Sequence, residues 1–119
     1  MCISKNKSQY FDKKYNLKDF KFQYDSVSIY FLKNDFINFL QEKKIKLDKF
    51  KHLTINIFVY DINLNNDVIA KNHLSNYDDE NLNIELINKM IDNTLLLINW
   101  EYIFKSKIFD VVDISISII

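Results

Sequence analysis

Two histidines, His52 and His73, are the only side chains of this sequence that could supply imidazole chemistry. Ser75 follows His73 by two residues, so a serine nucleophile with a histidine base has to be considered. Such a serine normally sits on a strained turn between a strand and a helix, which the residues around Ser75 do not indicate. We therefore expect both histidines to be ordinary side chains of a loop or a strand end.

A run of alternating oxygen donors matches part of a calcium-binding loop and consists of Asp61, Asn63, Asn65 and Asp67. Loops of this type need a glycine at their sixth position and a bidentate glutamate at their twelfth. Those two positions hold Asn66 and Asn72, and the residues before Asp61 have the pattern of a strand. The run therefore predicts a hairpin turn at residues 65–67 and no metal site.

Three consecutive acids, Asp78, Asp79 and Glu80, could bind the metal of a nuclease, with Asp61 and Asp110 as further ligands. A simpler explanation is that the acids open a helix, because side-chain oxygens cap the first N–H groups and negative charge favours a helix N-terminus. We expect a helix here and neither a metal nor another cofactor. A small metal-dependent nuclease is kept as an alternative function.

An aromatic series, Trp100, Tyr102 and Phe104, could stack nucleic-acid bases, as in proteins that bind single strands. Such proteins add a basic groove, whereas this series includes Glu101 and lies in the acidic half of the chain. We expect the three rings to lie in the core or to face a protein partner, since aromatic anchors dominate protein interfaces.

The amino-acid composition explains part of this lack of recognisable catalytic and binding motifs. The chain has 119 residues, sixteen lysines, no arginine, no glycine, no proline and a single alanine. The residues that replace them have AT-rich codons, so the bias is typical of a low-GC gene. Without glycine the phosphate-binding loops of nucleotide-binding folds are excluded, and turns must use asparagine or aspartate.

Length and cysteine content indicate one domain in a reducing compartment. A chain of this length usually forms a single core. The single cysteine, Cys2, permits no internal disulfide, and the sequence shows neither a secretory signal nor a long apolar segment. We expect a cytoplasmic protein in which residues 1–19 form a loosely ordered basic arm and residues 20–119 form a single α+β domain.

Hydrophobic periodicity predicts the elements of that domain. Alternation predicts strands over residues 20–24, 27–31, 53–64, 68–70 and 108–118. A helical period predicts helices over residues 34–44 and 78–92. Alternation favours a strand over residues 94–104, although a continued helix also fits.

These elements predict an α+β fold. We expect one mostly antiparallel sheet with two helices on one face. The order of strands and helices resembles the split βαβ, or ferredoxin-like, arrangement with an extra C-terminal strand.

Charge is unevenly distributed along the chain although the net charge is zero. Residues 1–59 hold twelve lysines and six acids, while residues 60–119 hold four lysines and ten acids. A neutral domain is a poor nucleic-acid binder, so we expect a protein partner with a basic surface. The residues expected to contact this partner are Asp61, Asp67, Asp78, Asp79, Glu80 and Glu85.

Small size, low-GC composition, the expected cytoplasmic location and the lack of catalytic residues together resemble the immunity proteins of bacterial contact-dependent and other polymorphic toxin systems. The resemblance is one of type and transfers no residue roles. It implies a non-catalytic antitoxin that binds and blocks one cognate toxin, with acidic side chains covering a basic, nuclease-type active site. A viral or phage accessory protein that acts through protein–protein interaction is the other interpretation that the sequence leaves open.

Overall fold

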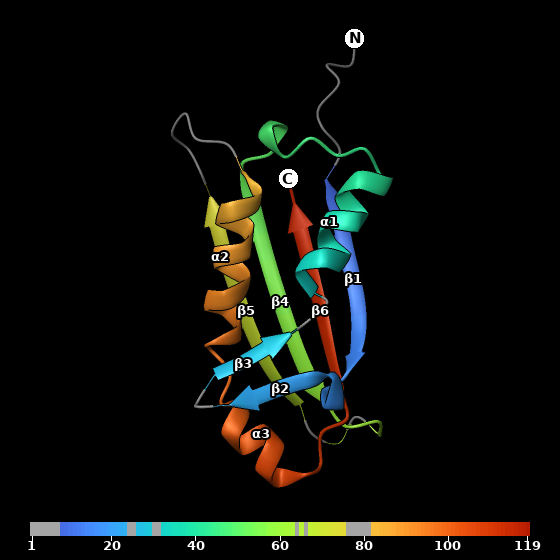
Figure 1. Cartoon of the computed structure of the whole chain (residues 1–119), viewed down its shortest axis with the longest axis vertical. Coiled ribbons are helices and arrows are strands. Elements are labelled where there is room, and N and C mark those ends of the chain that lie inside the picture. The colour runs from blue at the N-terminus through green and yellow to red at the C-terminus, as the bar shows by residue number, and fades with distance from the viewer. Residues whose placement is uncertain (1–7, 24–25, 30–31, 64, 66, 76–81) are drawn as a thin grey trace.

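The fold is α+β and is built on a four-stranded antiparallel sheet (Figure 1). The computed structural model describes residues 8–23, 26–29, 32–63, 65, 67–75 and 82–119. The strands of the sheet lie in the order β1 (Gln9–Asn16), β6 (Val111–Ile118), β4 (His52–Tyr60), β5 (Asp67–Ser75). The first and last strands of the chain are therefore neighbours, and β5 and β1 form the two edges.

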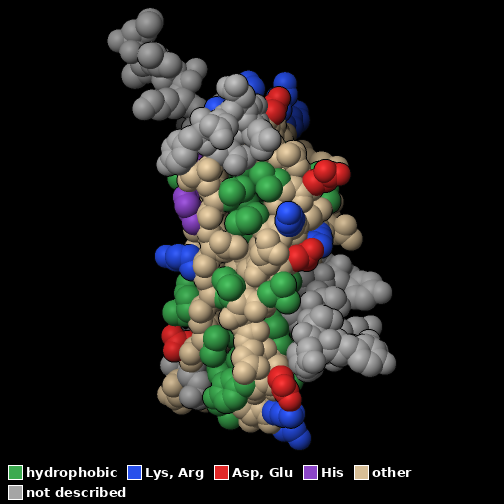
Figure 2. All heavy atoms as spheres, turned by 90° about the vertical axis from the view of Figure 1, so that its left-hand side faces the viewer, with side chains coloured by type: hydrophobic (Ala, Val, Ile, Leu, Met, Phe, Trp, Pro, Cys, Tyr) green, Lys and Arg blue, Asp and Glu red, His purple; other side chains and the backbone are tan. Residues whose placement is uncertain are grey.

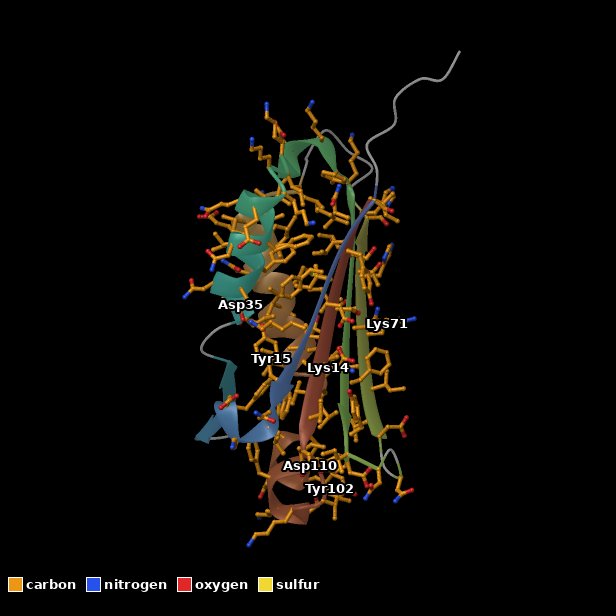
Figure 3. The ribbon with its side chains drawn as sticks, turned by 90° about the vertical axis from the view of Figure 1, so that its right-hand side faces the viewer. Lys14, Tyr15, Asp35, Lys71, Tyr102 and Asp110 are labelled. Atoms are coloured by element: carbon orange, nitrogen blue, oxygen red, sulfur yellow. The ribbon has the colours of Figure 1, made fainter. Side chains whose placement is uncertain are left out.

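The helices and a small hairpin all lie on one side of this sheet. In Figure 1 the hairpin and the two longer helices lie in front of the strands and the short last helix lies at their foot, and the side view of Figure 3 shows no helix on the other side. The helices are α1 (Leu32–Glu42), α2 (Ile84–Leu95) and α3 (Trp100–Ser106), and the hairpin pairs β2 (Phe20–Gln23) with β3 (Ser26–Ile29). Two short 3-10 turns cover Leu17–Asp19 and Leu47–Lys49.

Strict alternation of apolar residues makes the sheet a two-faced layer. In β4 every second side chain is fully buried beneath the helices, and β6 continues the same face. These residues are Leu53, Ile55, Ile57, Val59, Val112, Ile114, Ile116 and Ile118. The helices supply the opposing stripe, with Phe36 of α1 and Ile87 and Ile91 of α2 completely covered.

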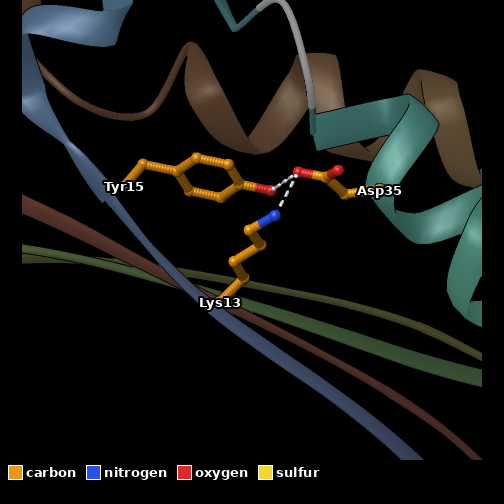
Figure 4. A network of polar contacts seen from close by, with 3 residues as sticks. All are labelled: Lys13, Tyr15 and Asp35. Atoms are coloured by element: carbon orange, nitrogen blue, oxygen red, sulfur yellow. Dashed lines mark hydrogen bonds and ion pairs between the residues drawn. The ribbon is translucent and has the colours of Figure 1, made fainter.

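A buried tyrosine fastens α1 to β1, as Figure 4 shows. The Tyr15 hydroxyl donates to Asp35 Oδ2 at 2.8 Å, and Lys13 Nζ lies 3.0 Å from the same oxygen. Burial, the hydrogen bond to Asp35 and its negative charge all raise the pKa of Tyr15 far above its usual value. Tyr15 therefore stays protonated and acts as a donor.

The end of α1 is a turn that would ordinarily use glycine. The amide of Ile45 donates to Leu40 O at 2.9 Å and that of Lys44 donates to Gln41 O at 3.2 Å, which is the Schellman arrangement. Lys44 takes the left-handed conformation that this arrangement needs, with φ of 53°. The chain has no glycine, so a lysine carries the strain.

The prediction of a loosely ordered arm over residues 1–19 is wrong where the structure describes it. Residues 9–16 form β1, which pairs along its whole length with β6. Phe11 and Tyr15 point into the core, and both are less than a tenth exposed. Residues 1–7 of the expected arm lie outside the described residues.

The prediction of a strand over residues 94–104 is also wrong, because helical structure continues through most of this segment. α2 runs to Leu95, and α3 begins at Trp100 after Asn99, whose side chain accepts from the amide of Tyr102 at 3.2 Å. The indole of Trp100 donates to Leu95 O at 2.7 Å, so the two helices are joined at a buried corner.

The expected ferredoxin-like order is not found among the described residues. A split βαβ unit contains parallel strands, whereas every described strand pair is antiparallel. β3, expected to belong to the sheet before the first helix, pairs with β2 in a separate hairpin. The predicted hairpin between β4 and β5 is confirmed.

The remaining helix predictions hold in outline and fail at their ends. α1 begins at Leu32, two residues before the expected cap. α2 begins at Ile84 with Asn83 as its N-cap, whose side chain accepts from Leu86 N at 2.9 Å. The acids at residues 78–80, expected to open this helix, lie outside the described residues. None of the described helices has the length and apolar character needed to cross a membrane.

Candidate functional site: the open face of the sheet

None of the described helices or strands covers the sheet face opposite the helices, and we call this the open face. The cross-strand register arranges its side chains in rows that run from β1 through β6 and β4 to β5. The upper row is Tyr10, Ser117, Thr54 and His73, and the next is Asp12, Ser115, Asn56 and Lys71. Below them follow Lys14, Asp113, Phe58 and Ile69, and then Asn16, Val111, Tyr60 and Asp67.

A chain of hydrogen bonds joins the two histidines at the upper end of the open face. Thr54 Oγ1 lies 2.9 Å from His73 Nδ1, and Ser75 Oγ lies 2.7 Å from His73 Nε2. The same Ser75 oxygen lies 2.9 Å from His52 Nδ1. The two imidazole rings are nearly parallel, with centroids 6.4 Å apart, and histidine appears in purple near one end of the molecule in Figure 2.

From the sequence, both histidines were expected in a loop or at a strand end, and nothing indicated that they lie close together. His52 does open β4, but His73 lies inside β5. Their proximity follows from the register, which sets His52 opposite Ser75 and Thr54 opposite His73. Strand assignment alone could not have shown it, because a shift of one residue would send one histidine to the helix face.

A pair of carboxyl groups lies in the middle of the open face. Asp113 of β6 forms a hydrogen bond with Asp12 of β1. Burial raises the pKa of Asp113 from 3.8 to about 6, and the hydrogen bond and negative charge of Asp12 add to this effect, whereas Lys14 opposes it. Asp113 therefore keeps its proton to a higher pH than an ordinary aspartate does.

Two polar side chains beside this pair are shielded from solvent. Ser115 is only 5% exposed although it lies on the open face. The Oδ1 atom of Asn56, next along the row, is buried and accepts no hydrogen bond from the described residues. A buried acceptor of this kind is uncommon in folded proteins.

The lower end of the open face contains a groove of about 450 Å³ that is lined mainly by apolar atoms. Its walls are Lys14, Tyr15, Asn16, Tyr60, Ile62 and Val111. Ile62 is 74% exposed, which is unusual for so large an apolar side chain. We call this feature the hairpin-end groove, because it lies beside the turn between β4 and β5.

Asp110 holds the strands together at this end. Its backbone amide donates to Tyr60 O at 3.0 Å, its backbone oxygen accepts from Leu17 N at 2.8 Å, and its side chain accepts from Ile62 N at 3.0 Å. Figure 3 shows Asp110 at the foot of the sheet, near Tyr102 of α3. Asp110 therefore has a structural explanation and is not needed as a metal ligand.

The acids predicted to contact a partner fall into three groups. Asp61 and Asp67 flank the β4–β5 turn at the hairpin-end groove, where the Asp61 side chain accepts from Asn65 N at 2.7 Å. Glu85 lies in the first turn of α2, at the opposite end of the sheet (Figure 1). Asp78, Asp79 and Glu80 lie outside the described residues. The structure therefore does not bring Asp61, Asp67 and Glu85 into one patch.

The uneven distribution of charge along the sequence corresponds in part to a separation of lysines and acids between the two ends of the folded molecule. Beyond the C-terminal end of α1, lysines line a shallow hollow of about 300 Å³, at the end of the molecule away from the β4–β5 turn (Figure 1). They are Lys43, Lys44, Lys46 and Lys49. The acids Asp61, Asp67 and Asp110 gather at the other end.

The aromatic series is divided between the core and the surface. Trp100 is 4% exposed and stacks near Phe20, whereas Tyr102 is 52% exposed. This outcome agrees with the expected core role for Trp100. In the part of the chain that the structure describes, no three histidine, cysteine or acidic side chains form a group that could hold a metal ion.

Comparison with known proteins yields no match to a protein family, to a curated protein or to a solved structure.

Proposed function

We propose that this chain is a non-catalytic protein-binding module, an immunity protein that binds and blocks a cognate toxin. The observation that carries the proposal is the hairpin-end groove with Asp61, Asp67 and Asp110 beside it. The groove offers exposed apolar surface at Ile62 beside the partly exposed Tyr60, and the acids offer charge complementarity to a basic active site.

The arrangement has the two components of a protein interface. Binding energy in such interfaces comes mostly from a few aromatic and apolar contacts in a desolvated centre, and the rim is polar. Tyr60, Ile62 and Val111 would form the centre. Charged groups at the rim mainly raise the rate of encounter and select the partner.

The three acids lie next to residues that line the groove. Asp67 is paired with Tyr60 in the sheet, Asp61 follows Tyr60 in the chain, and Asp110 precedes Val111. A lysine or arginine of a toxin that reached this end would lie near these carboxylates, and Lys14 adds one positive charge to the groove wall. The same contact would exclude nucleic acid from a nuclease active site by occlusion.

Co-expression with the product of the neighbouring gene tests the proposal. We expect a stable complex that survives gel filtration, together with loss of the toxin's activity. Ile62→Glu places a negative charge in the apolar centre of the interface, and Asp67→Lys reverses the sign of one charge at its rim. Each should weaken binding at least tenfold, and Asp67→Lys should also slow association at low salt.

Glu85→Lys is the matched control, because it makes the same change of charge at the far end of the sheet. A complex that forms equally well with Ile62→Glu and Asp67→Lys would show that the interface lies elsewhere. A chain that remains alone and leaves the toxin active would exclude the immunity function itself.

A further inference from the structure

The hydrogen-bonded group at the upper end of the open face, His52, Thr54, His73 and Ser75, has no role in the proposed partner contact. We propose that His52, His73 and Ser75 form a binding site for a divalent transition metal that prefers imidazole, such as Cu²⁺ or Zn²⁺. The inference rests on geometry alone and does not depend on the proposed function.

Two ring nitrogen atoms, one from each histidine, converge on one point. His52 Nδ1 and His73 Nε2 lie 2.9 Å and 2.7 Å from the same atom, Ser75 Oγ. Imidazole nitrogens bind zinc at about 2.0–2.1 Å. When the Ser75 hydroxyl donates to His73 Nε2, His52 Nδ1 must donate to the Ser75 oxygen, so a metal ion can bind His52 only after its proton moves from Nδ1 to Nε2. With that change of tautomer and small side-chain rotations, an ion beside Ser75 would reach both nitrogens.

Thr54 holds His73 in an orientation that fits metal binding. Thr54 Oγ1 contacts His73 Nδ1 at 2.9 Å. When the hydroxyl oxygen accepts the Nδ1 proton, the lone pair of His73 lies on Nε2, the atom that points toward Ser75. Histidines that bind metals almost always donate their other ring N–H in this way.

The backbone of two paired strands supports the site. His52 and Thr54 lie on β4, and His73 and Ser75 lie on the paired strand β5. All four side chains therefore project from adjacent positions of one rigid ladder, where sites are held more accurately than on loops. His73 is exposed, so an ion can enter from solvent and water can complete its coordination.

The donor set defines the class of ion. Two imidazoles and a neutral hydroxyl suit copper, zinc and nickel, whereas magnesium and calcium require carboxylate and carbonyl oxygens. Two nitrogens are fewer than the four ligands of a closed structural zinc site. The site is therefore an open one, and Cu²⁺ should bind more tightly than Zn²⁺.

Titration of the full chain with Cu²⁺ and with Zn²⁺ at pH 7.5 tests the site. All variants carry Cys2→Ser, because a cysteine thiolate is an alternative soft ligand. We expect one ion per chain, a loss of at least tenfold in affinity for His52→Ala and for His73→Ala, and a loss of about 10- to 100-fold for Thr54→Val. Ser117→Ala, which removes a neighbouring hydroxyl from the same row, should bind as the unchanged chain does.

Spectroscopy of the chain with both histidines present keeps the test valid if a variant fails to fold. The electron paramagnetic resonance spectrum of the Cu²⁺ complex should show coupling to two nitrogens, and Zn²⁺ should shift the ring resonances of both histidines together. The absence of binding, or binding that survives in the folded His52→Ala/His73→Ala double variant, would overturn the proposal. So would coupling to a single imidazole.

Discussion

Asp12 and Asp113 share a hydrogen bond on the open face, although both are carboxyl groups. The two residues lie on neighbouring strands, diagonally across the ladder that pairs Asp12 with Ser115 and Lys14 with Asp113. Burial raises the pKa of Asp113 to about 6, and the hydrogen bond and negative charge of Asp12 add to this rise. A neighbouring negative charge disfavours ionisation because two like charges repel each other.

The first prediction concerns the pH dependence of stability. The folded pKa of Asp113, about 6, exceeds the ordinary value of 3.8, so between these values the folded chain holds a proton that the unfolded chain has lost. The contribution of this group is therefore fully present below the ordinary pKa and is lost as the pH rises through 6. Asp113→Asn should remove this loss and stabilise the protein at pH 7 by at most about 1 kcal/mol after solvent screening.

Urea unfolding of both proteins between pH 4 and pH 7 would measure the effect as a difference in the free energy of unfolding. Lys14→Met is the control with the opposite sign, because the charge of Lys14 lowers the pKa of Asp113. We expect Lys14→Met to be less stable at pH 7 than the unchanged chain. A difference between Asp113→Asn and the unchanged chain that does not vary with pH would contradict the assigned pKa.

The second prediction concerns the contact between Tyr15 and Asp35. Tyr15→Phe removes only the hydroxyl that donates to Asp35 Oδ2 at 2.8 Å. A partly buried hydrogen bond to a charged group contributes about 1.5–3 kcal/mol, so we expect a loss near the middle of that range. Unfolding in urea would measure it.

Lys13 supplies the comparison, since its ammonium group lies 3.0 Å from the same oxygen but is largely exposed. Lys13→Met should cost at most about 1 kcal/mol, as is usual for an exposed ion pair. If the two variants lost equal stability, the hydroxyl would not be the dominant contact that its burial indicates.

Strands in which apolar and polar residues alternate regularly were predicted from the sequence, whereas a strand in which a charged residue interrupts this alternation was not. β4 and β6 alternate without interruption, so their inward faces were predicted. β1 was missed because Lys13 occupies an inward position between Phe11 and Tyr15. A lysine in an inward position is explained by its ion pair with Asp35, which the sequence does not show.

Helix ends and the candidate site were harder to predict for two different reasons. Asparagine is so frequent in this chain that Asn83 and Asn99, which cap helices, could not be distinguished from turn residues. The histidine group depends on strand register, and the hairpin-end groove depends on the neighbouring positions of three strand ends. Neither can be read from local periodicity.

The third prediction concerns the helix α3, where a strand was expected. Asn99 caps α3 by accepting from Tyr102 N, and Asn83 caps α2 by accepting from Leu86 N. Asn99→Ala and Asn83→Ala should each destabilise the protein by about 1 kcal/mol. Asn99→Asp retains an acceptor, so we expect it to unfold at nearly the same urea concentration as the unchanged chain. An unaffected Asn99→Ala variant would argue against the cap.

The fourth prediction concerns Lys44, which ends α1 with φ of 53°. The left-handed conformation costs an ordinary residue about 1–2 kcal/mol, and glycine adopts it freely. Part of that gain is offset because glycine makes the unfolded chain more flexible, so Lys44→Gly should stabilise the protein by about 0.5–1 kcal/mol.

Lys44→Ala removes the same charge and keeps the backbone strain, so it should not stabilise the protein. Lys43→Gly, one residue earlier where φ is not positive, should destabilise. Thermal unfolding of the three variants would separate backbone strain from charge, and equal stabilisation by Lys44→Gly and Lys44→Ala would assign the effect to charge instead.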